Sequence, residues 1–175
     1  MIGYRHCDSR FPFLWSDSSQ PAARWHDVGE APAYYFADTP VGAWAEFIRH
    51  EGITDVDDLR GVRRALWAVE LPDNGYQAPT LADDVVCGDL SSYPACRAEA
   101  SRLRRQGATQ LVAPSAALLP GGATGWVCAP ILQTSATPRD GRVIVLFGPR
   151  PAATGWPIVD AGAPSPLVCP LVRHL

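Results

Sequence analysis

The chain has 175 residues, 47% of them hydrophobic and 19% charged, a composition typical of one soluble globular domain. Its formal net charge of −3 argues against nucleic-acid binding, which usually depends on a basic face or arm. The five cysteines lack Cys-x-x-Cys spacing and no apolar run reaches signal-peptide or membrane-span length, so we expect no metal site, no membrane partner and a cytoplasmic location.

The first third of the chain combines short apolar segments with one long irregular stretch. Tyr4 lies in what reads as a first strand. Residues 11–28 carry prolines, serines and aspartates around Trp15 and Trp25, which predicts a long loop with aromatic anchors. The run Ala33-Tyr34-Tyr35-Phe36-Ala37 is too apolar to face water and predicts a strand.

A helix is predicted directly after this strand. Asp38 or Thr39 can cap it, and Pro40 suits its first turn. Its end is expected near Glu51-Gly52. The apolar stripe at helical spacing consists of Ala43, Phe47 and Ile48. The polar side is formed by Arg49, His50 and Glu51.

Strands and a second helix are predicted over the middle of the chain. Residues 65–71 alternate in the manner of a strand, and residues 83–87 form a candidate short strand. Ser91 or Ser92 then opens a helix that ends before Gly107. Its apolar stripe consists of Cys96, Ala100 and Leu103.

The last third begins with two predicted strands and ends in a tail. Residues 109–113 read as a strand that runs into Pro114-Ser115, and the β-branched run 142–147 reads as another. Residues 149–170 are dense in proline and glycine, so we expect them to wrap the surface or stay partly disordered, without a regular helix. The sum is an α+β fold with a few short helices.

Three separated polar residues lie in apolar or tightly turning surroundings. Glu46 either points to solvent or turns inward, and inside it needs a hydrogen bond or a cationic ligand. Arg24 either lies along Trp25 at the surface or uses its planar fork to bind phosphate. Ser115 either bonds its own turn or contacts a ligand. No Gly-x-Ser-x-Gly elbow surrounds this serine, which disfavours an acyl-transfer nucleophile.

The order of these three residues resembles the signature of the RES domain family, which is named after Arg, Glu and Ser. The motifs that carry the resemblance span residues 3–150. They are Tyr4-Arg5, Arg24-Trp25 with Gly29, Tyr35-Phe36-Ala37, Ala43 to Glu46, the helix before Gly107, Pro114-Ser115-Ala116 and the strand 143–147. Ala23 and His26 replace the family's usual glycine and asparagine beside Arg24-Trp25.

The resemblance implies an ADP-ribosyltransferase-like split β-core around a NAD-binding cleft. Residues 1–150 would form the catalytic domain, with residues 151–175 packed on it or trailing from it. The catalytic residues would be Glu46, Arg24 and Ser115. The residues that bind NAD would be Arg5, Arg24, Trp25, Tyr35 and Ser115.

The same resemblance implies an enzyme that cleaves the nicotinamide–ribose bond of NAD, by hydrolysis or phosphorolysis. NAD would be its substrate, and no metal would be needed. Such an enzyme would act as the toxin of a bacterial toxin–antitoxin pair, with an Xre-like antitoxin as partner. Two alternatives stay open: transfer of ADP-ribose to a protein, and a non-catalytic partner-binding domain.

Overall fold

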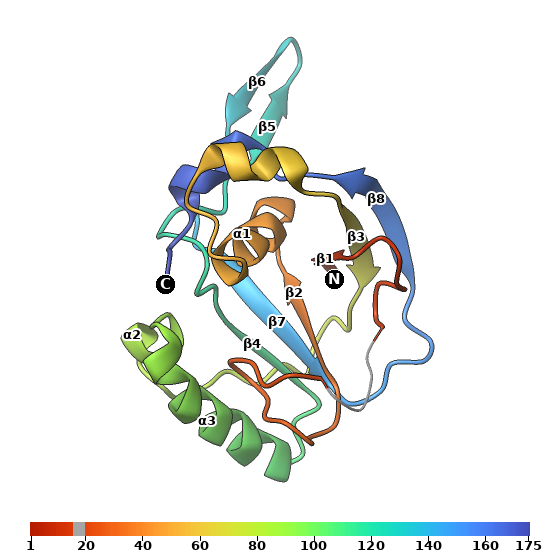
Figure 1. Ribbon diagram of the computed structural model, residues 1–175, viewed down its shortest axis with the longest axis vertical. Coiled ribbons are helices and arrows are strands. Elements are labelled where there is room, and N and C mark those ends of the chain that lie inside the picture. The colour runs from red at the N-terminus through yellow and green to blue at the C-terminus, as the bar shows by residue number, and fades with distance from the viewer. Residues whose placement is uncertain (16–19) are drawn as a thin grey trace.

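A computed structural model describes residues 1–15 and 20–175 (Figure 1). Its main sheet has the strand order β4-β7-β2-β1-β3-β8, and every neighbouring pair is antiparallel. A few short helices accompany it, so the fold is α+β, as predicted. The strands of this sheet are β1 (Ile2–Cys7), β2 (Ala33–Ala37), β3 (Arg64–Glu70), β4 (Gln110–Pro114), β7 (Arg142–Phe147) and β8 (Gly155–Gly162).

The sheet is divided between β1 and β2. These strands share a single register pair, Tyr4 with Ala37. Beyond this pair β1 stays with β3 along its whole length, and β2 stays with β7. Two half-sheets therefore diverge from one point of contact.

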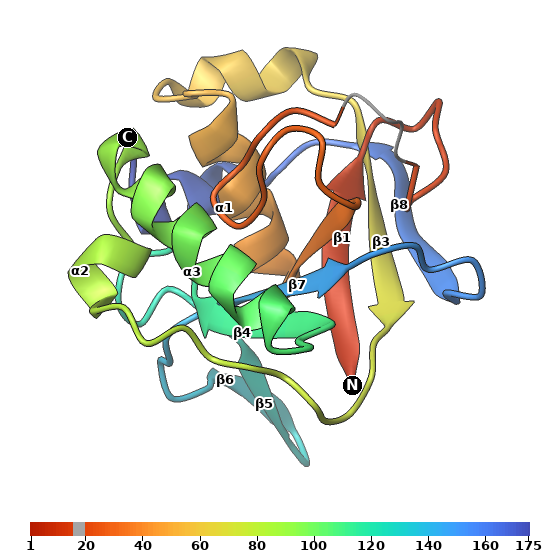
Figure 2. The same cartoon turned by 90° about the horizontal axis from the view of Figure 1, so that it is seen from below.

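The helices α1 (Pro40–His50) and α3 (Tyr93–Arg105) cover the same face of the two half-sheets. Side chains alternate between faces along a strand, and Val143, Val145 and Phe147 of β7 belong to the cluster under α3. Ala37 shares that face and packs under α1 instead. Figure 2 shows α3 lying over β4 and β7. The space between the two helices thus lies above the division of the sheet.

Helix α1 begins and ends where the sequence predicts. Thr39 is its N-cap, and the side-chain oxygen accepts a hydrogen bond from the Gly42 amide at 3.0 Å. Pro40 occupies the first turn and Glu51 is the C-cap, followed by Gly52 with φ +64. Arg49, expected on the polar side, is instead only 4% exposed.

The segment after residue 82 and the hairpin after β4 differ from the prediction. Residues Asp83–Val86 form a helical turn, α2, and not a strand. Acidic side chains at Asp83 and Asp84 suit a helix start, and the following apolar pair is too short to define a period. The strands β5 (Trp126–Ala129) and β6 (Leu132–Ser135) form a hairpin that no periodicity predicted, and it projects from the body (Figure 1).

Three 3₁₀ segments, η1 (Val56–Gly61), η2 (Leu90–Ser92) and η3 (Pro166–Leu171), connect or follow these elements. The long loop 11–28 is irregular in its described parts, and its residues 16–19 lie outside the described residues.

The tail after residue 149 is ordered into the fold. Its strand β8 pairs with β3, which was not predicted, and η3 packs against α1. Val168 and Val172 join the same hydrophobic cluster as Trp44 and Ile48 of α1. We propose that residues 151–175 complete the domain that residues 1–150 begin.

Shortening the buried valines of the tail tests this proposal. Val168→Ala and Val172→Ala should each lower the free energy of unfolding by about 2 kcal/mol, because each loses two buried carbons and leaves a cavity. Urea denaturation measures the change. The exposed Leu167→Ala serves as control and should stay within about 0.5 kcal/mol of the parent. Equal stability of all the variants would show that the tail is dispensable.

Candidate active site

A cavity of about 770 Å³ lies between α1 and α3, at the division of the sheet. This volume falls within the range of roughly 300–1,000 Å³ that small-molecule sites occupy. β1 and β2 both contribute walls, as do the loop around residue 24 and the start of α3. The sequence-predicted residues that line it are Arg5, Arg24, Trp25, Tyr35 and Glu46.

Glu46 faces this cavity from the middle of α1, and Ser115 holds it in place. The Ser115 hydroxyl donates to Glu46 Oε1 at 3.1 Å. The Ser115 hydroxyl oxygen also accepts hydrogen bonds from the amides of Ala117 and Leu118, both at 3.2 Å. A hydroxyl has one proton and two lone pairs, so all three are in use. Ser115 thereby positions Glu46 and does not itself line this cavity. Its contact with ribose or phosphate, which the resemblance implies, stays a prediction.

The charge of Glu46 is set by opposing effects. Burial raises the pKa of its carboxyl above the ordinary value. The Ser115 hydroxyl, and then the positive charges of Arg49 and Arg24, lower it again without cancelling the effect of burial. The result is a carboxyl group that ionises less readily than a surface glutamate.

Arg24 is fixed by neutral partners. Its guanidinium donates to the Gly88 carbonyl at 2.7 Å and to Ser92 Oγ at 2.9 Å. Its carbon lies 4.5 Å from the centre of the Tyr93 ring, in cation–π geometry. These contacts orient the fork beside the cavity, and within residues 1–15 and 20–175 Arg24 forms no salt bridge.

Arg49 is a site residue that the sequence analysis missed. It follows Glu46 by three positions and so shares its side of the helix. Its guanidinium donates to the carbonyls of Gly88 at 2.8 Å, Arg173 at 2.8 Å and Ala116. The side chain thereby ties α1 to the segment after β4 and to the tail. The three-residue spacing from Glu46 in the sequence could have indicated that Arg49 lies on the same side of the helix.

Arg5 bridges the two half-sheets where their strands separate. Its guanidinium donates to the Tyr35 carbonyl of β2 at 3.1 Å, across the gap that β-pairing leaves open. Its Nε is buried and has no hydrogen-bond partner among the described residues. Burial penalises the charged form of this guanidinium and so lowers its pKa, and an unpaired charge is costly in such surroundings.

Trp25, Tyr35 and His26 hold the loop that presents Arg24. The Trp25 side chain is 0% exposed and packs with α3, which favours the anchoring role over stacking on a ligand. Tyr35 Oη accepts from the Trp25 amide at 2.9 Å and lies 3.0 Å from His26 Nδ1. The Ala23 amide donates to the His26 carbonyl at 3.0 Å, which closes a tight turn around Arg24. The two departures from the family pattern are thus the ends of this turn.

The cavity carries more positive charge than its own carboxylates neutralise. Within residues 1–15 and 20–175, several of its arginines form no salt bridge. They are Arg5, Arg24, Arg49 and Arg64. Arg64 Nη2 lies 3.4 Å from His6 Nδ1, and burial with the nearby Arg64 and Arg5 charges lowers the His6 pKa to about 3. Neutral His6 adds no positive charge, so the positive potential comes from the arginines, which would stabilise an anion here.

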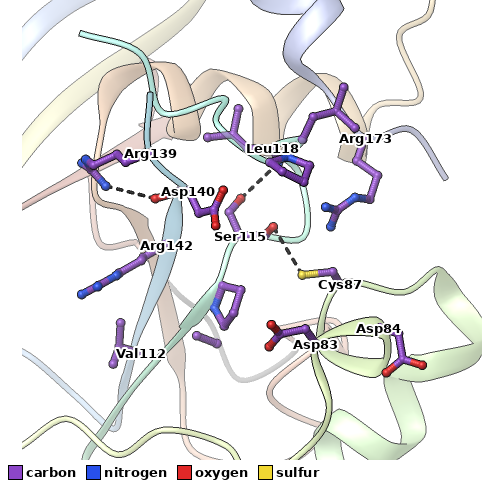
Figure 3. Close-up of a pocket in the computed structure, with 15 residues that line it drawn as sticks. Asp83, Asp84, Cys87, Val112, Ser115, Leu118, Arg139, Asp140, Arg142 and Arg173 are labelled. Carbon is purple, nitrogen blue, oxygen red and sulfur yellow. Dashed lines mark hydrogen bonds between the residues drawn. The ribbon is translucent and has the colours of Figure 1, made fainter. Parts of the chain in front are cut away.

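A second cavity, of about 870 Å³, is lined by Ser115 (Figure 3). Asp83 and Asp84 of α2 line it, and Figure 3 shows Arg173 opposite them. The Cys87 thiol donates to the Ser115 carbonyl at 3.7 Å and forms part of the wall. Ser115 therefore lines the second cavity while its hydroxyl bonds to Glu46, which lines the first and not the second.

The comparisons assign the chain to a class. The model of the RES domain matches residues 4–164, and the chain therefore belongs to the RES domain family. No curated protein matches it. The match extends past residue 150, through β8.

Two further properties of the described residues bear on the site. No group of three metal-ligating side chains in this part of the chain lies close enough to hold an ion. None of its helices has the length and apolar character to cross a bilayer.

Replacing Glu46 by its neutral isostere tests the burial of this carboxyl. Because its folded pKa lies above 4.5, the unfolded state ionises first as pH rises, and the folded state loses stability until pH passes the folded pKa. Glu46→Gln should therefore be more stable than the parent at neutral pH and equally stable below about pH 3. Denaturation across this pH range measures the difference.

Exposed Glu70→Gln is the matched control and should change stability little at either pH. A less stable Glu46→Gln at neutral pH would show that the attraction of Arg24 and Arg49 outweighs burial.

Proposed function

We propose that this protein degrades NAD by cleaving the bond between nicotinamide and ribose. One observation carries the proposal: a single cavity joins a carboxylate held by Ser115 to arginines that form no salt bridge among the described residues. NAD presents both complementary features, a dianionic pyrophosphate and a ribose that becomes positive during cleavage. Membership of the RES domain family, whose domains are NAD-related, supports the same substrate.

The proposed roles follow from charge. Departure of nicotinamide leaves an oxocarbenium-like cation at the anomeric carbon, which the Glu46 carboxylate stabilises. Nicotinamide nitrogen keeps the electron pair of the broken bond and becomes neutral, so no general acid is required. Arg24 and Arg5 hold the pyrophosphate through their guanidinium groups. Ser115 keeps the carboxylate aimed at the sugar and keeps one of its oxygens hydrogen-bonded.

An acceptor completes the reaction by forming a bond to the anomeric carbon. With water the products are ADP-ribose, nicotinamide and a proton. With inorganic phosphate, a phosphate oxygen forms the new bond, and the products are nicotinamide and ADP-ribose that carries a phosphate at the anomeric carbon. Transfer to a protein is the alternative. It is disfavoured by Trp44, which stands where arginine-specific transferases often carry a second glutamate, two residues before the catalytic one.

The biological setting we propose is a bacterial toxin–antitoxin pair in the cytoplasm, with NAD as target and an Xre-like protein as antitoxin. This part of the proposal rests on the family. A non-catalytic partner-binding domain is the competing function, and the exposed side chains of the β5–β6 hairpin, Trp126 and Ile131, are the feature that favours it.

Nicotinamide release from NAD measures the proposed activity directly. Glu46→Gln should lower the rate by about 100-fold or more, since the stabilising charge is lost while the fold is kept. Chromatography with and without inorganic phosphate identifies the acceptor. Glu70→Gln should retain the parent rate. A folded parent protein that releases no nicotinamide in either buffer would refute NAD cleavage as the function.

Expression in bacterial cells tests the toxin role. The parent chain should lower the cellular NAD pool and arrest growth, whereas Glu46→Gln at the same soluble level should do neither. Metabolite extraction and growth curves report the two effects. Harmless expression of a chain that cleaves NAD in vitro would separate the activity from the toxin role.

A further inference from the structure

The aromatic side chains around the Glu46 cavity differ in how much free ring surface they offer. Trp25 and Phe36 are buried in the core and present almost no surface. Tyr35 is half-buried and is tied to the loop through its hydroxyl. Tyr93 is half-buried as well, and the guanidinium of Arg24 lies over its ring. These rings belong to the protein's own packing.

Phe11 and Trp15 are different. They line the same cavity and are 42% and 49% exposed. Their rings stack on each other at 4.8 Å between centres with an angle of 26° between planes. The Arg10 guanidinium lies 5.7 Å from the Phe11 ring. Trp15, the more exposed of the two, offers the larger open aromatic surface of the pair.

The pair is preorganised by the turns that carry it. The Phe11 amide donates to the Asp8 carbonyl at 3.0 Å, and the Trp15 amide donates to the Pro12 carbonyl at 2.9 Å. The Asp8 carboxylate accepts from the Arg10 guanidinium at 2.7 Å and fixes the first turn further. Both rings are exposed, and neither is among the described residues of the hydrophobic clusters, so the pair is not part of the core.

We propose that the Phe11–Trp15 pair is the platform on which the adenine ring of NAD stacks. The inference rests on the proposed function and adds the position of the second half of the substrate. NAD has two flat rings on either side of one pyrophosphate. With the nicotinamide ribose at Glu46 and the pyrophosphate at the arginines, the adenine reaches the loop after β1. Stacking on an aromatic side chain binds any base by its π-face.

The platform makes the enzyme selective for the dinucleotide. Nicotinamide mononucleotide contains the scissile bond but no adenine, so it makes no stacking contact with the Phe11–Trp15 pair. Trp15→Ala should lower kcat/KM for NAD about tenfold, chiefly through KM, and leave kcat/KM for the mononucleotide unchanged. Trp126→Ala is the matched control, since Trp126 is 71% exposed and does not line the cavity.

Two kinetic outcomes overturn the platform. Equal loss for both substrates would mean that Trp15 supports the fold or the reacting end. No loss for NAD would mean that the adenine lies elsewhere.

Binding of AMP, measured by calorimetry, separates the platform from the proposed function because it requires no turnover. The parent chain and Trp15→Phe should bind AMP similarly, and Trp15→Ala should bind it about tenfold more weakly. Failure of the parent to cleave either substrate would refute the function while this AMP series still supported or refuted the platform. AMP affinity that is equal in all three chains would overturn the platform even if NAD is cleaved.

Discussion

A carboxylate placed inside a protein needs partners, and the site is arranged around meeting that need for Glu46. Ser115 meets it with a hydroxyl whose other two hydrogen-bonding positions are occupied by backbone amides. This places strict demands on the backbone: β4 must end beside α1, and the chain must turn at once so that two amides converge on one oxygen. Ser115 thus joins helix α1 to the end of β4, in addition to the direct chain connection from β2 into α1.

The division of the sheet is the second condition for the site. Had β1 and β2 paired along their length, strand backbone would fill the space that the cavity occupies. Arg5 spans the gap with a hydrogen bond to the Tyr35 carbonyl, which satisfies an acceptor that a neighbouring strand would otherwise satisfy. The same guanidinium brings positive charge to the opening. Arg5 therefore both bridges the two half-sheets and contributes positive charge that favours an anion in the cavity.

Local patterns predicted much of this fold, because caps, stripes and β-branched runs report directly on the helices α1 and α3 and on β2, β4 and β7. They could not predict β8, whose strand character comes from pairing with β3, or the short turn Asp83–Val86, which is too brief for a period. In the site, the family resemblance pointed to Glu46, which lines the cavity. Arg49 was missed because its charge suggested an exposed side chain, whereas the structure buries it. Composition also could not separate the buried Trp25 from the exposed Trp15, since burial is decided by tertiary packing.

The β5–β6 hairpin and the Glu46 cavity should respond differently to ionic strength. No charged residue occurs between residues 123 and 138, and none of these residues lines either cavity. Contacts made through this uncharged hairpin are insensitive to screening, while the cavity with its surplus of arginines attracts anions less strongly as ionic strength rises. Added salt should therefore weaken anion binding at the cavity and leave contacts of the hairpin unchanged.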